Sequence, residues 1–80
     1  GYLKSRQTVC YEIFRELERE KTEFLNRSVI VMVHPEVAAR FYDEERTHLE
    51  RMEEKLNASI MVKADPNTHL DQYDITILEV

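Results

Sequence analysis

The sequence contains little glycine, proline or cysteine, with one Gly, two Pro and one Cys in 80 residues, and it has no Trp. Because Gly and Pro interrupt regular structure, their scarcity indicates that most of the chain lies in helices and strands. Cys10 has no second cysteine in this chain, so neither an internal disulfide nor a cysteine-based zinc site can be completed by it alone. A single thiol is typical of a reducing compartment.

Long hydrophobic runs and an excess of basic residues are also missing. No run approaches the ~20 apolar residues that cross a bilayer, and no apolar stretch typical of a secretory signal opens the sequence. We therefore expect a cytoplasmic chain without membrane contact. The formal charge is −5, from 16 acidic and 11 basic residues. This balance argues against a surface built to neutralise phosphates, because nucleic-acid binding commonly uses a basic stripe.

The apolar residues that are present form clear patterns. Hydrophobic residues make up 42% of the sequence, which suffices for one core, and we expect a domain over residues 8–80 after a linker over residues 1–7. Apolar residues recur at helical spacing over residues 8–25. Either Thr8 or Ser5 is suited to cap this helix, because a hydroxyl can accept from the free N–H groups of the first turn.

The middle of the chain reads as a strand followed by helices. Residues 28–33 are apolar and rich in β-branched side chains, which predicts a strand that is apolar on both faces and therefore central in the sheet. His34 and Pro35 then open a helix, with His34 as its cap. A second helix ends near Asn57. We predict two helices with a break near Tyr42, and one bent helix is the alternative.

The last third predicts two more strands, over residues 60–64 and 73–80. Residues 65–68 have the composition of a turn, since Pro fixes φ and Asx side chains bond the nearby backbone, so we expect the two strands to form a hairpin. The predicted order is α-β-α-α-β-β. Three helices over a three-stranded sheet form two layers, and the expected fold class is α+β.

Four short segments carry a resemblance to a known family. They are Thr8-Val9-Cys10-Tyr11-Glu12-Ile13-Phe14-Arg15-Glu16, His34-Pro35-Glu36-Val37-Ala38, Lys63-Ala64-Asp65-Pro66 and Gln72-Tyr73-Asp74-Ile75. Each is weak alone, but together they span nearly the whole chain in the family's order and spacing. In this respect the chain resembles the C-terminal small domain of the ribonuclease E/G-family endoribonucleases.

The resemblance implies a parent enzyme that cuts single-stranded RNA in RNA processing and decay. It implies magnesium held by aspartates and a Cys-x-x-Cys zinc link, both outside this chain, with Gly1 as the last glycine of that link. It also implies that the small domain helps to build the oligomer. The expected partners are therefore the rest of the parent enzyme and its other protomers, with RNA bound through the parent.

No residue of this chain is predicted to be catalytic or to bind a cofactor or metal. Cys10 lies on the apolar face of its helix, where a thiol is commonly an inert hydrophobe. The loop acids Asp65, Asp71 and Asp74 lack the Gly and the bidentate Glu of a calcium loop. The acids at 43–45 are explained as the start of a helix, where negative charge is stabilised.

The predicted functional feature is a surface on the sheet. If the helices cover one face, the strand residues that point to the other face form an apolar patch, and such a patch on a soluble domain often marks a partner site. The predicted interface comprises Ile30, Met32, Met61, Leu78, Val80 and, on the first helix, Tyr11. The alternative is that terminal residues or the first helix cover this face.

An RNA-binding module is the alternative class of function. The order strand-helix-helix-strand is also found in KH domains, which would make the chain a stand-alone RNA-binding module. KH domains hold nucleotides with a Gly-x-x-Gly loop between the two helices. Here residues 41–45 occupy that junction, and they are acidic and lack glycine, so the sequence disfavours this reading.

Overall fold

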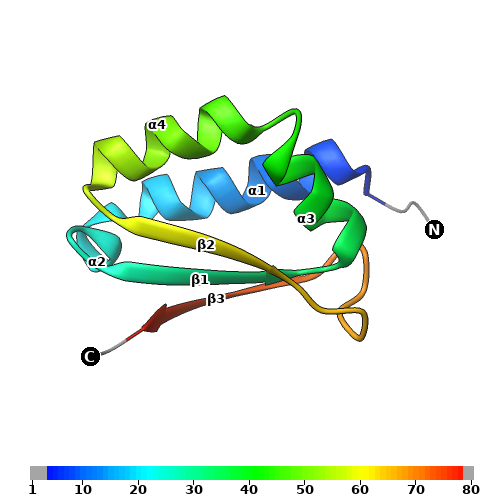
Figure 1. Cartoon of the computed structure of the whole chain (residues 1–80). Helices are drawn as coiled ribbons and strands as arrows, with labels where there is room; N and C mark the ends of the chain where they lie inside the picture. Colours follow the sequence, from blue (N-terminus) through cyan, green and yellow to red (C-terminus); the bar gives the residue numbers. More distant parts are fainter. Residues whose placement is uncertain (1–3, 79–80) are drawn as a thin grey trace.

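The computed structural model describes residues 4–78. A layer of helices covers one face of a three-stranded sheet (Figure 1), which confirms the α+β class. The elements in chain order are α1 (Arg6–Arg19), α2 (Lys21–Phe24), β1 (Ser28–Val33), α3 (Pro35–Tyr42), α4 (Arg46–Leu56), β2 (Ser59–Ala64) and β3 (Tyr73–Leu78). Val80, one of the predicted interface residues, lies outside the described residues. Gly1, predicted as the last glycine of the zinc link, also lies outside them.

The first helix begins earlier and ends earlier than predicted. Ser5 is its cap, because the Ser5 Oγ accepts from the Thr8 N–H at 3.1 Å, so two residues of the expected linker are helical. The prediction of one continuous helix over residues 8–25 is wrong, because α1 ends at Arg19. Glu20 leaves the helical region at φ −109° and ψ 34°, and α2 adds one separate turn. The apolar spacing continues across this break, so periodicity cannot detect it.

The sheet has the order β2-β1-β3, with β1 parallel to β2 and antiparallel to β3. The prediction that the first strand is central is confirmed. The predicted hairpin between the last two strands is wrong, because they lie on opposite sides of β1. The helices between β1 and β2 return the chain to the start of the sheet, which makes these strands parallel. The 65–72 loop then passes the end of β1 to reach its other side.

Two asparagines align the starts of the parallel strands. Asn26, before β1, and Asn57, at the end of α4, both have positive φ, of 60° and 49°, a conformation that Asn tolerates better than most residues. Their side chains join directly, with the Asn57 Nδ2 donating to the Asn26 Oδ1 at 2.7 Å. The backbone continues the link, because the Ser59 N–H donates to the Arg27 carbonyl at 3.0 Å.

The helices after β1 follow the sequence prediction closely. The His34 Nδ1 accepts from the Glu36 N–H at 3.1 Å, and Pro35 is the first helical residue. Residues 43–45 separate α3 from α4, so the two-helix prediction is confirmed over the bent-helix alternative. This break lets α4 cross back over β2 while α3 contacts both α1 and β2.

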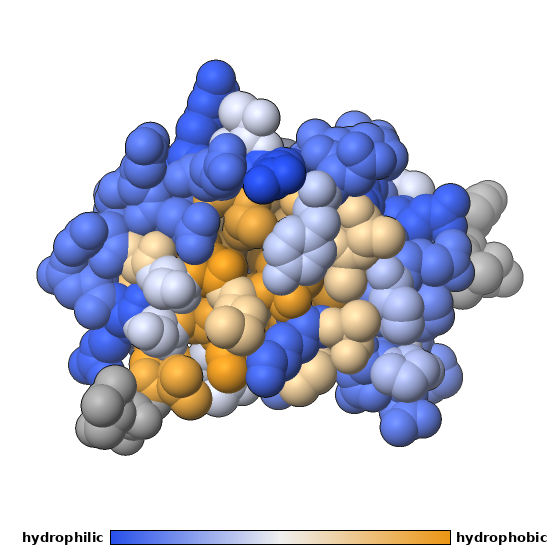
Figure 2. All heavy atoms as spheres, viewed as in Figure 1, coloured by the Kyte–Doolittle hydropathy of each residue, from blue (hydrophilic) through white to orange (hydrophobic). Residues whose placement is uncertain are grey.

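The core lies between the helices and the sheet. Val29, Val31 and Val33 of β1 point into it and are at most 1% exposed. Helix residues supply the other wall, and Phe14 and Phe41 meet there edge to face with ring centroids 5.3 Å apart. Viewed from the edge formed by β2, apolar side chains gather in the middle of the molecule below the hydrophilic helices (Figure 2). The helical layer therefore uses one face of the sheet.

Candidate interaction surface

The other face of the sheet carries the predicted strand residues. α1, α3 and α4 all lie on the opposite side of the sheet (Figure 1). The alternative that the first helix covers this surface is therefore wrong. Because side chains alternate along a strand, the buried valines of β1 leave Ile30 and Met32 on the second face. We call this surface the open face; its described strand residues are Ser28, Ile30, Met32, Ser59, Met61, Lys63, Asp74, Thr76 and Leu78.

The strand register arranges these side chains in rows across the sheet. Ile30 lies between Met61 on β2 and Thr76 on β3. Ser28 lies at the level of Leu78. Met61 is 50% exposed and Leu78 is 52% exposed, while Ile30 and Met32 on the central strand are half-buried. The structure thus brings four of the six predicted residues onto one surface.

The third row is charged at its two ends. Met32 lies between Lys63 on β2 and Asp74 on β3, and the Thr76 hydroxyl hydrogen-bonds the Asp74 carboxylate at 3.4 Å. Among residues 4–78, neither Lys63 nor Asp74 forms an ion pair. Alternation along β2 and β3 places both residues on this face, although neither is among the predicted interface residues.

Tyr11 belongs to a different surface. It lies on α1 in the helical layer, is 57% exposed, and has the Arg15 guanidinium carbon 5.9 Å from its ring centroid. The structure therefore does not bring Tyr11 together with the open face, and any contact that it makes would be a separate one.

The outer edge of β2 is occupied by side chains, which the sequence analysis did not foresee. The Glu53 carboxylate accepts from the Ile60 N–H at 2.9 Å. The Tyr42 hydroxyl donates to the Val62 carbonyl at 2.6 Å. Free edge groups invite pairing with another strand, and these two contacts block that on the β2 side. No periodic signal marks such contacts, because they join residues that are distant in sequence.

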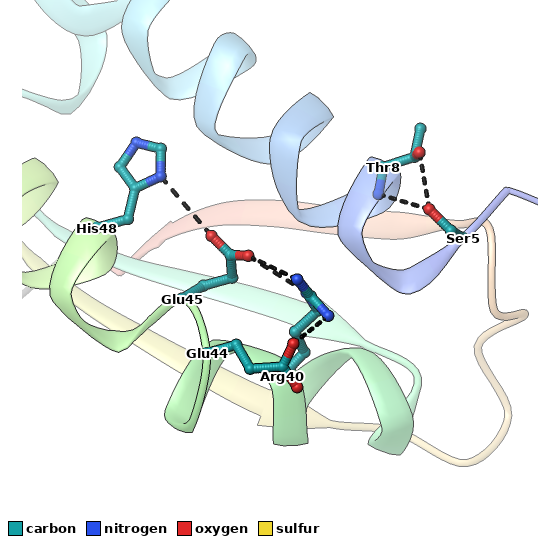
Figure 3. Close-up of polar contacts among 6 residues, drawn as sticks. All are labelled: Ser5, Thr8, Arg40, Glu44, Glu45 and His48. Carbon is teal, nitrogen blue, oxygen red and sulfur yellow. Dashed lines mark hydrogen bonds and ion pairs between the residues drawn. The ribbon is translucent and has the colours of Figure 1, made fainter.

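The polar residues at the α3–α4 junction form a local network (Figure 3). The Arg40 guanidinium contacts the Glu44 and Glu45 carboxylates. The other Glu45 oxygen lies 3.8 Å from the His48 Nδ1, and the His48 ring stacks on Phe14 at 3.9 Å between centroids. α4 begins at Arg46, directly after these acids, as predicted. In addition, the Glu44 and Glu45 side chains tie this junction to α3 through Arg40.

The remaining candidate ligands do not converge. Within residues 4–78, no group of three or more His, Cys, Asp or Glu side chains is placed to hold a metal ion. Asp65 has the predicted turn role, since its carboxylate accepts from the Asn67 N–H at 2.9 Å and from the Thr68 hydroxyl at 3.0 Å. A hollow of about 710 Å³ lies at the end of α4 and is lined by Glu50, Glu53, Glu54, Asn57, Ala58 and Ser59. This acidic hollow would repel a phosphate.

The two strongest pKa shifts belong to groups in the core or at its margin. Burial and, to a smaller extent, the nearby Glu45 carboxylate raise the pKa of the Cys10 thiol to about 12. Burial also raises the pKa of Tyr73 to about 12, together with the hydrogen bond that its hydroxyl donates to Glu16 at 2.7 Å. Both groups are neutral at pH 7, and a buried neutral thiol is a poor nucleophile.

Comparison with known proteins defines the class of this domain. The profile of a family described as "RNase E/G, Thioredoxin-like domain" matches residues 1–78, and the chain belongs to that family. In this chain, the term thioredoxin-like cannot denote dithiol chemistry, because Cys10 is the only cysteine and is fully buried.

The chain is also similar to curated ribonucleases. It is 30% identical over 78 residues to Ribonuclease G of Escherichia coli (strain K12), and 30% identical over 80 residues to Ribonuclease G of Haemophilus influenzae. Each alignment covers 98% of this chain and 16% of the relative. The chain thus spans about one sixth of the length of these relatives. Among the described residues, no helix is long and apolar enough to cross a membrane.

Proposed function

We propose that this chain is the C-terminal small domain of a ribonuclease E/G-type endoribonuclease and that it contributes to assembly of the enzyme's oligomer. The observation that carries the proposal is the open face, where Met61 and Leu78 are half exposed although both are large and apolar. Exposed apolar surface of this kind favours a protein contact, because burying it removes the apolar area from water.

In this proposal the parent enzyme cleaves single-stranded RNA in the cytoplasm, and the catalytic magnesium and the zinc link lie outside this chain. The similarity to Ribonuclease G supports the parent's identity. The chemistry of the present residues supports a non-catalytic role. Cys10 is buried and His34 accepts a backbone hydrogen bond, while Glu45 is engaged by Arg40.

The test is the oligomeric state of the full-length enzyme with Met32→Lys and Leu78→Lys on the open face. A lysine buried against a partner loses hydration without gaining a counter-charge, so we expect sedimentation velocity to show dissociation into smaller species. The matched control is Ala39→Lys, which adds the same charge on the exposed side of α3. Circular dichroism checks that every variant is folded.

An oligomer that is unchanged in both open-face variants, with the fold intact, would contradict the proposal. Dissociation caused equally by Ala39→Lys would also contradict it, because the effect would then come from charge rather than from the face.

A stand-alone RNA-binding module is the alternative. Residues 43–45 at the helix junction are all acidic, and Glu44 and Glu45 pair with Arg40 rather than leaving a cradle for phosphate. Titration of the 80-residue chain with single-stranded RNA at low salt separates the two functions. We expect no saturable binding; binding that weakens steeply with added salt would favour the alternative.

A further inference from the structure

The geometry points to a second copy of this same face as the partner of the open face, related by a two-fold axis that runs along β1 between the two sheets. This arrangement pairs Lys63 of each copy with Asp74 of the other. The inference rests on the proposed function and adds to it the identity of the contacting surface and the residues that set its orientation.

The charged row is arranged so that a two-fold axis pairs its opposite charges. Lys63 and Asp74 lie at the same level, on either side of Met32. A two-fold axis along β1 keeps each level in place and exchanges the two sides, so β2 of one copy faces β3 of the other. Lys63 then faces Asp74 of the partner, and the same contact occurs twice, as in any isologous interface.

The same axis brings the uncharged residues of the two copies together. Met32 meets Met32 of the second copy and Ile30 meets Ile30 on the axis, while Met61 faces Thr76 and Leu78 faces Ser59. No like charges oppose each other in this arrangement. Methionine suits a contact between identical surfaces, because its flexible, polarizable side chain adapts to the shape that it meets.

A second face-to-face orientation leaves both charges without partners. An axis in the plane of the sheets but perpendicular to the strands, through Ile30, would place Lys63 against Ser59 and Asp74 against Leu78. Each charge would then be covered without a partner, which is strongly unfavourable. Of the two orientations, the axis along β1 is the one that neutralises both charges. The chain carries a net charge of −5, and yet the described strand residues of the open face hold one charge of each sign.

The size of the face sets the strength of the contact. Three strands of six residues span a footprint of about 300 Å², well below the roughly 800 Å² that each partner contributes to a standard interface. We therefore expect weak association of the 80-residue chain by itself and stronger association where the rest of the parent adds contacts.

Disulfide trapping detects a weak dimer and reports its geometry. The 80-residue chain has its own buried core, and Cys10 is too deeply buried to compete. Under mild oxidation by oxidised glutathione, Met32→Cys is expected to form covalent dimers several-fold faster than the control Ala39→Cys. Met61→Cys alone should match the control, but Met61→Cys mixed with Thr76→Cys should form heterodimers. A Met32→Cys rate equal to that of the control would overturn the inference.

Charge exchange in the full-length enzyme provides the second test. Lys63→Asp and Asp74→Lys, each alone, place like charges together and should weaken the assembly by about tenfold or more. The double variant exchanges the two charges and should restore it. If Met32→Lys dissociates the oligomer while the double variant stays as weak as the single variants, the orientation is wrong but the proposed function stands. If Met32→Lys has no effect, both fail.

Discussion

The two faces of β1 lie in opposite environments although their side chains come from the same six residues. Val29, Val31 and Val33 are at most 1% exposed beneath the helices, while Ile30 and Met32 between them stay half-buried on the open face. One strand can therefore supply a core with one face and leave apolar side chains partly exposed on the other. The following variants test this difference between the faces.

The largest effect is expected from Phe41→Ala on the covered side. Phe41 is fully buried and packs against Phe14, so the truncation should lower the free energy of unfolding by about 3–5 kcal/mol. A domain of this size has a stability of ~5 kcal/mol, so most of that stability should be lost, and circular dichroism should show unfolding at a much lower urea concentration. Met61→Ala on the open face should cost under ~1 kcal/mol in urea unfolding. Equal losses would contradict the distinction between the faces.

Neighbouring residues of β1 allow a sharper comparison. Val31→Thr places a hydroxyl in the core and should cost about 1–3 kcal/mol, because the buried group loses its hydrogen bonds to water. Ile30→Thr places a hydroxyl on the open face, where water remains available, and should cost clearly less. Urea midpoints of the two variants give the measurement. If Ile30→Thr is the more harmful change, the open face is covered within the chain itself.

A smaller effect is expected at the edge of the sheet. Tyr42→Phe removes the hydrogen bond to the Val62 carbonyl and should lower the free energy of unfolding by about 0.5–1.5 kcal/mol. Tyr11→Phe is the matched control, because Tyr11 is similarly exposed, 57% against 53% for Tyr42. Thermal unfolding should separate the two variants, and a shift that is the same in both would exclude a role for the edge contact.

Titration of Cys10 and Tyr73 should have the smallest effect on stability near pH 7 and should become visible only at alkaline pH. The pKa of Cys10 rises from 9.0, and that of Tyr73 from 10.0, each to about 12 in the folded chain. The unfolded chain therefore loses these protons first, so their contribution to stability is complete below pH 9 and declines between pH 9 and 12. Urea unfolding over this range should show a shallower decline in Cys10→Ala and in Tyr73→Phe than in the unaltered chain. Unchanged slopes would contradict the pKa shifts.

Sequence reasoning succeeded where the signal is local. The cap at Ser5 or Thr8, the start at His34 and Pro35, and the turn at Asp65 each depend on a side chain that bonds backbone within three residues. Alternation along the strands also assigned the buried and open sides of β1, because side-chain direction follows directly from strand geometry.

Prediction failed where distant segments compete. The hairpin between β2 and β3 was inferred from their nearness in sequence, but β1 occupies the place between them. The end of α1 at Arg19 was missed because Phe24 preserves the helical spacing beyond it. Neither the strand order nor the end of α1 can be predicted from a short stretch of sequence, because each depends on which surfaces pack together.

By itself, the amino-acid sequence determined the approximate positions of the three strands and of α1, α3 and α4, the side of β1 that faces the core, and the family that the four motifs resemble. The tertiary structure alone decided that β1 separates β2 from β3, and so placed Lys63 and Asp74 at the two ends of one row. The reason is that the direction of a side chain is fixed by its own strand. Its neighbours across the sheet depend instead on how segments far apart in sequence share the central strand.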